Sequence, residues 1–174
     1  MMKLLNALGF QAGWWACITS VARGLEVEAI VFCLCLIGVH LRFSKSTRLE
    51  VKIGLVALLL GILLDSGLQY FSVIDFYGWA LGPLSPFWIW TLWVMFALTL
   101  NSSLAFLKKQ SLIISASLGL IFGPMTYYAG AELGAADLDA SISHFLSLGV
   151  AWMLAMPLMV FIAQQLSLTA KDNT

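Results

Sequence analysis

The sequence predicts an all-α membrane protein, a polytopic transmembrane helical bundle of about six spans. Composition is the first reason: 61% of the 174 residues are hydrophobic and 10% are charged, and the mean hydropathy is +0.94. Soluble domains contain roughly 45–50% apolar and about 25% charged residues, and a soluble fold could not bury this much apolar surface. The second reason is that the apolar residues form long runs separated by short polar segments.

The runs have the length of membrane-spanning helices. A span needs roughly 17–25 mostly apolar residues, because a helix rises about 1.5 Å per residue through a hydrocarbon core about 30 Å thick. No run alternates like a barrel strand, which leaves helices to satisfy the backbone in lipid. The second run is short and must extend into its flanks or thin the bilayer. The six predicted spans lie near Leu4–Ala22, Glu28–Leu41, Val51–Phe71, Phe87–Leu107, Leu112–Ala131 and His144–Leu166.

These spans form one predicted transmembrane domain over residues 1–168, followed by a polar cytoplasmic tail, 169–174, that is too short to fold. Basic residues in short loops favour the cytoplasmic side of a membrane. With the amino terminus inside, eight of the nine basic residues fall on that side and only Arg23 lies outside. We therefore expect a multi-pass protein of a bacterial inner membrane with both termini in the cytoplasm.

The first run also has features of a secretory signal peptide. Lys3 precedes it, and Ser20-Val21-Ala22 resembles a cleavage site. Asn6, Gln11 and the Trp14-Trp15 pair are atypical of a signal peptide's apolar region, and cleavage would leave five spans. We expect the segment to be retained as the first span.

Small residues recur on one face of the fifth span. Ser115, Gly119 and Gly123 are spaced four residues apart. In lipid, small side chains allow helix backbones to approach closely. The stripe predicts that this span packs tightly against a neighbouring helix, or against a partner subunit.

Asp65 is the most informative residue of the chain because it lies well inside the third span. An aspartate near the bilayer centre costs about 2.5–3.5 kcal/mol on insertion scales, so it should face protein or water. It shares a helical stripe with Gly54, Gly61 and Gln69. One interpretation is structural: the carboxyl pairs with Arg23 or forms neutral hydrogen bonds. The other is functional: it carries a proton in a transporter or acts as a general acid or base.

Other polar and aromatic residues fall at a similar depth in this topology. The candidate buried polar site comprises Asp65, Gln69, Arg23, Tyr127, Glu132 and His144. Tryptophans also gather in the outer half, and four of them lie too deep for an interfacial aromatic belt. These four, which predict an aromatic cavity open to the outer side, are Trp14, Trp15, Trp93 and Trp152.

Recognisable catalytic and metal-binding motifs are missing from the sequence. It contains no phosphate-binding loop with lysine, no His-Glu-x-x-His and no Gly-x-Ser-x-Gly. Cys17, Cys33 and Cys35 lie in apolar runs and are interpreted as core residues. We expect no metal and no cofactor, and because the basic and acidic residues cancel, no nucleic-acid partner. Whether the protein is an enzyme stays open.

Four short patterns carry a resemblance to a known family. They are Phe10-Gln11-x-Gly13-Trp14-x-x-Cys17, the Leu-Asp65 pair, Trp93-x-x-Phe96-Ala97-x-Thr99-Leu100, and Gly123-Pro124-x-x-Tyr127-x-x-Gly130-x-x-Leu133-Gly134. The chain resembles, over nearly its whole length, a bacterial inner-membrane protein family known only as a domain of unknown function. The resemblance implies a small polytopic membrane protein and supplies no activity, substrate or catalytic residue.

Three functions remain open at this point. The first is the handling of a lipid or a small hydrophobic ligand in a polar and aromatic cavity in the outer half of the bundle. The second is proton-coupled transport, although the two halves show no matching pair of broken helices. The third is a structural or assembly role in a homo- or hetero-oligomer, which the small-residue stripes favour. In each case the lipid bilayer is the expected surrounding.

Overall fold

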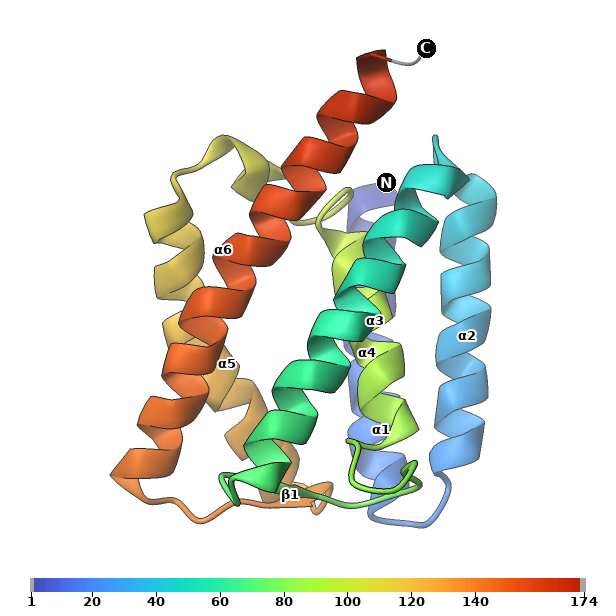
Figure 1. Ribbon diagram of the computed structural model, residues 1–174. Helices are drawn as coiled ribbons and strands as arrows, with labels where there is room; N and C mark the ends of the chain where they lie inside the picture. The colour runs from blue at the N-terminus through green and yellow to red at the C-terminus, as the bar shows by residue number, and fades with distance from the viewer. Residues whose placement is uncertain (1, 173–174) are drawn as a thin grey trace.

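The computed structural model describes residues 2–172. Within them the chain forms six α-helices, as the all-α prediction requires, together with a short 3₁₀-helix and two strands of two residues each (Figure 1). The helices are α1 Met2–Val21, α2 Glu26–Phe43, α3 Thr47–Tyr70, α4 Phe87–Thr99, α5 Leu112–Glu132 and α6 Ile142–Asp172, and the 3₁₀-helix is η1 Ala105–Lys109.

The two strands, β1 Asp75–Phe76 and β2 Ala136–Asp137, pair antiparallel and join the segments that follow α3 and α5. Both ends of the chain lie at the opposite end of the bundle from this ladder (Figure 1). We call these two ends of the bundle the terminal end and the ladder end. Three helices are long and apolar enough to cross a membrane, namely Thr47–Tyr70, Leu112–Glu132 and Ile142–Ala170, and Phe87–Thr99 is a shorter apolar helix.

Two helices are longer than predicted. α2 begins at Glu26 and ends at Phe43, so the short second run does extend into its flanks. α6 continues to Asp172 and includes the first four residues of the predicted tail, 169–174. The last two tail residues lie outside the described part of the chain.

The fourth predicted span, Phe87–Leu107, is wrong at its carboxyl end. The helix stops at Thr99, whose carbonyl accepts hydrogen bonds from the N–H groups of Ser102 and Leu104 in a turn. Serine and asparagine side chains compete with helical backbone bonding, and Asn101-Ser102-Ser103 follow directly. α4 is therefore 13 residues long, about 20 Å at about 1.5 Å per residue.

α4 is the central helix of the bundle. It packs against α1, α2 and α3, and Trp88, Trp93 and Met95 are among its buried side chains. α5 and α6 form a tightly packed hairpin that joins the rest of the bundle through contacts between α6 and α3. Neither helix of the hairpin forms an extensive backbone interface with α4 among the described residues.

Glycines make two of these helix contacts possible. A methyl group on Gly119 would lie 2.2 Å from the backbone oxygen of Trp152, and one on Gly61 would lie 2.2 Å from the ring of Trp93. Real side chains do not approach so closely, so any larger residue forces the helices apart. Ser115 and Gly123, which share the Gly119 stripe, are also buried.

Candidate functional site

Asp65 lies at the centre of a hydrogen-bonded group that joins three helices. Its side chain is completely buried. The indole N–H of Trp93, on α4, donates to Asp65 Oδ2 over 2.6 Å, and the hydroxyl of Tyr127, on α5, donates to Asp65 Oδ1 over 2.5 Å. The carboxyl group therefore holds one aromatic ring from each of two neighbouring helices.

A tryptophan of α6 completes the aromatic group. Trp152 stacks on Trp93 with ring centroids 5.0 Å apart and an interplanar angle of 12°. Phe96 and Tyr127 meet Trp152 edge-on, at 5.8 and 6.1 Å. Stacked and edge-to-face pairs each contribute roughly 0.5–1.5 kcal/mol beyond the area that they bury. The rings form a wall with a fixed geometry.

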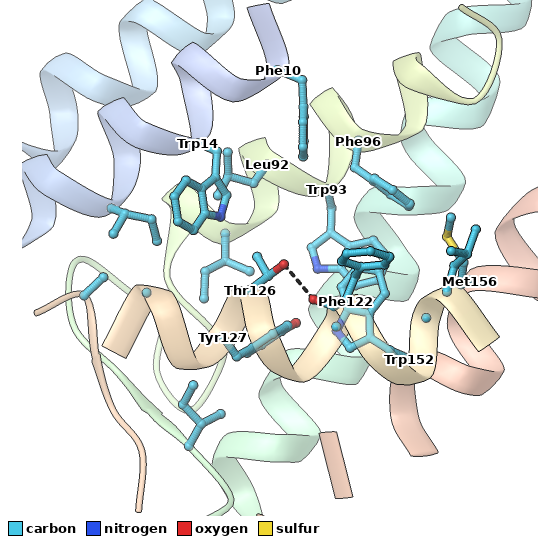
Figure 2. A pocket seen from close by; sticks show the side chains of 18 of the residues that line it. Phe10, Trp14, Leu92, Trp93, Phe96, Phe122, Thr126, Tyr127, Trp152 and Met156 are labelled. Carbon is cyan, nitrogen blue, oxygen red and sulfur yellow. Dashed lines mark hydrogen bonds between the residues drawn. The ribbon is translucent and has the colours of Figure 1, made fainter. Parts of the chain in front are cut away.

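This wall borders a cavity of about 430 Å³ between α1, α4 and α5 (Figure 2). The volume falls within the range of small-molecule sites, roughly 300–1,000 Å³. Asp65 does not line the cavity, since Trp93 and Tyr127 stand in front of it. The aromatic residues that line this aromatic cavity are Phe10, Trp14, Phe76, Trp88, Trp93, Phe96, Phe106, Phe122, Tyr127 and Trp152.

α1 and α5 approach each other near the ladder. A methyl group on Gly130 of α5 would lie 3.2 Å from Ile18 of α1. In the turns that follow the two helices, a methyl group on Gly134 would lie 3.2 Å from Ala22. Over the rest of their length the two helices form no extensive interface among the described residues. α5 slants away from α1 toward the terminal end (Figure 1). Two lining residues are more than half exposed: Phe122, midway along α5, and Phe106, at the terminal end.

The structure brings together only part of the predicted polar site. Asp65 and Tyr127 are bonded, whereas Arg23 is exposed in the turn after α1 and forms no ion pair with Asp65 within residues 2–172. Glu132 is exposed at the end of α5. His144 Nδ1 lies 3.2 Å from the backbone oxygen of Asp139, away from the carboxyl.

Gln69 and Trp15, two further predicted site residues, lie in different environments. Gln69 lies one helical turn beyond Asp65 on α3, and its side-chain oxygen is buried with no hydrogen-bond partner in the described structure. Trp15, unlike Trp14, Trp93 and Trp152, does not line the cavity. It is 52% exposed and packs edge-on against Trp14. Consecutive helical residues point about 100° apart, so the two rings of the pair could not both face inward.

The cavity is also not confined to the outer half of the predicted topology. Lining residues run from Phe76 and Ala136 at the ladder to Leu104 and Leu107 at the terminal end. There are two reasons. α5 diverges from α1, and α4 ends early, so that residues of η1 also line the cavity.

Sequence reasoning missed a polar network at the terminal end. Glu50 is buried and accepts a hydrogen bond from the side chain of Asn101 over 3.2 Å, while His40 Nε2 lies 3.8 Å from Glu50 Oε2. Lys108 donates to Asn101 Oδ1 over 2.7 Å and to Ser167 over 3.0 Å. The network ties α2, α3 and α6 to the segment after α4. The position of Glu50 near a loop gave no signal of burial.

A buried carboxylate at the ladder end was missed in the same way. Glu26, at the start of α2, accepts a hydrogen bond from the backbone N–H of Trp79 over 2.7 Å. The loop before α4 is also held by Trp88, whose indole donates to the Tyr77 carbonyl over 2.9 Å. Within residues 2–172 no group of three His, Cys, Asp or Glu side chains is placed to hold a metal ion.

Comparison with known proteins identifies a family but no activity. A family profile described as "Protein of unknown function (DUF2878)" matches residues 3–158. The chain belongs to this family. Three of the four patterns behind the resemblance contribute residues to the aromatic group or the cavity wall, among them Phe10, Trp93 and Tyr127. No curated protein and no solved structure matches the chain.

Proposed function

We propose that this DUF2878 protein is a six-span inner-membrane protein that takes up a hydrophobic molecule from the bilayer into the aromatic cavity. In this proposal the terminal end faces the cytoplasm, as the distribution of basic residues favours. The six antiparallel helices and the placement of both termini at one end support an even number of crossings (Figure 1). α4 is short for a span, and in this proposal the loops at either side complete its crossing.

The cavity is the observation that carries the proposal. Its side chains are apolar or aromatic, apart from the Thr126 and Tyr127 hydroxyls and the indole N–H groups, and both hydroxyls are already bonded, to Phe122 O and to Asp65. In a bilayer, a dry apolar opening between α1 and α5 faces lipid chains rather than water. An apolar ligand fits this opening, whereas a polar substrate would lose its hydration with few partners in return.

Photolabelling tests the proposal. The purified protein is placed in phosphatidylcholine nanodiscs with a neutral alkyl probe that carries a diazirine, and labelled peptides are mapped by mass spectrometry. We expect labelling in the peptides that contain Phe96 and Phe122, both of which line the cavity.

A matched pair of variants shows whether the label reports the cavity. Thr126→Trp adds a ring at a lining position, and we expect it to reduce labelling at Phe96 severalfold. Met125→Trp adds the same ring at the next residue of α5, which is exposed and does not line the cavity, and it should leave labelling unchanged. Equal labelling of both variants and the parent would contradict the proposal and favour a structural role.

A further inference from the structure

We infer that the ligand of the aromatic cavity is a single-chain anionic amphiphile, with its chain between α1 and α5 and its carboxylate or phosphate at Lys109. The inference rests on the proposed function and adds the chemical class and the orientation of the ligand.

The dimensions of the cavity suit one extended chain. Along α5 its lining residues run from Leu118 to Gly130, which is about 18 Å of helix at about 1.5 Å per residue. A volume of about 430 Å³ distributed over that length makes a narrow slot. A long-chain acyl group has this shape.

α1 and α5 approach each other at the ladder end of the slot and diverge toward the terminal end (Figure 1). Near the ladder, Gly130 of α5 lies close to Ile18 of α1, and Gly134 lies close to Ala22 in the turns that follow these helices. At the terminal end Phe106 lines the slot and is 52% exposed, and Phe122, midway along α5, lines it and is 56% exposed. A chain therefore enters with its tail toward the ladder, and its head group stays at the terminal end.

The charges at the two ends select the sign of that head group. Exposed acidic side chains, including Asp75, Asp137 and Glu132, outnumber the exposed basic side chain of Arg23 at the ladder end. Exposed basic side chains lie at the terminal end, and Lys109 is the one next to the slot. This charge difference favours an anionic head group at the terminal end.

The geometry of η1 places Lys109 at the mouth. In a 3₁₀-helix, side chains three residues apart lie above one another. Phe106 and Lys109 are so spaced, and Phe106 lines the slot. Lys109 is exposed, while the neighbouring Lys108 points elsewhere, to Asn101 and Ser167. A chain lying against Phe106 brings its head group within reach of the Lys109 ammonium.

Competition with the neutral photoprobe tests the inference. In phosphatidylcholine nanodiscs at alkaline pH, the probe is displaced by palmitate, by its neutral analogue palmitamide, or by palmitoyl lysophosphatidic acid. We expect palmitate to displace the probe at about fivefold lower concentration than palmitamide, the size of effect that one partly exposed ion pair produces. The palmitate and lysophosphatidic acid arms distinguish a carboxylate from a phosphate head group.

Two variants assign the effect to one lysine. Lys109→Gln should abolish the advantage of palmitate over palmitamide and leave displacement by palmitamide unchanged. Lys45→Gln removes an exposed positive charge from the α2–α3 turn at the same end and should keep the advantage. Equal displacement by all three competitors, or equal loss in both variants, overturns the inference while cavity binding stands. Failure of the neutral probe to label the parent protein overturns the proposed function itself.

Discussion

Asp65 accepts hydrogen bonds from two aromatic side chains that belong to different helices, and this determines how both rings face the cavity. The sequence predicted that Asp65 faces inward, because its stripe on α3 is rich in small residues. Arg23 could not be rejected as its partner from sequence, because depth along a helix says nothing of the direction in which a residue in another helix points. Tyr127 and Arg23 lie at similar predicted depth, and only the packing of the bundle distinguishes them.

Tyr127→Phe removes one of the two donors to Asp65. We expect the free energy of unfolding to fall by about 1–2 kcal/mol, because a buried acceptor loses a partner. Tyr128→Phe removes a hydroxyl from the next residue of α5, which is partly exposed, and should cost less than about 0.5 kcal/mol. Arg23→Gln should also lower the free energy of unfolding by less than about 0.5 kcal/mol. Denaturation in mixed micelles measures all three, and a large effect of Arg23→Gln would restore the ion-pair interpretation.

At the scale of elements, hydropathy predicted where the six helices lie but not where each of them ends. α4 ends at Thr99 because a polar turn interrupts a run that remains apolar on both sides. The buried carboxylates Glu26 and Glu50 are satisfied by groups far away in the sequence, so no local pattern could reveal them. The stripe of Ser115, Gly119 and Gly123 is local, and it lies on the α5 face that packs against α6.

Gly119→Ala tests the close approach of α5 and α6. The added methyl group meets the backbone oxygen of Trp152 at 2.2 Å, and we expect a loss of about 1–3 kcal/mol as the helices separate. Gly38→Ala is the matched control, because nothing lies within 4 Å of a methyl group there. It should be neutral or stabilising by up to about 1 kcal/mol through helix propensity. Thermal unfolding that ranks the two variants in the opposite order would contradict this packing.

Glu26→Ala tests how the loop before α4 is held. Removing the acceptor of the Trp79 N–H should speed hydrogen exchange at Trp79 and its neighbours. Glu28→Ala changes an exposed acidic residue in the first turn of the same helix and should leave exchange in the loop unaltered. Identical exchange in the parent and in Glu26→Ala would mean that the loop is held by its other contacts alone.

At the scale of the whole molecule, the chain passes back and forth between two ends that differ in charge. Basic residues gather with the termini, and acidic residues gather near the ladder. This separation was visible in the sequence because it depends only on the order of spans and loops. The cavity could not be located from the sequence, because it arises from the angle between α1 and α5.

Reporter fusions test the proposed orientation. Fusions after Lys45, Lys109 and Lys171 should report the cytoplasm, and fusions near Asp75 and Asp137 should report the outer side, because basic loops stay inside. A cytoplasmic signal near Asp75 would contradict the six-span arrangement.

The occupancy of the aromatic cavity is the central claim, and a crystal structure from a lipidic mesophase measures it directly. The account predicts elongated density in contact with Trp14, Phe96 and Phe122, three residues that line the cavity from different helices. The end of this density near Phe106 should continue toward Lys109. If α1 and α5 instead meet along their whole length and their side chains fill the space between them, no ligand site exists and the account is wrong.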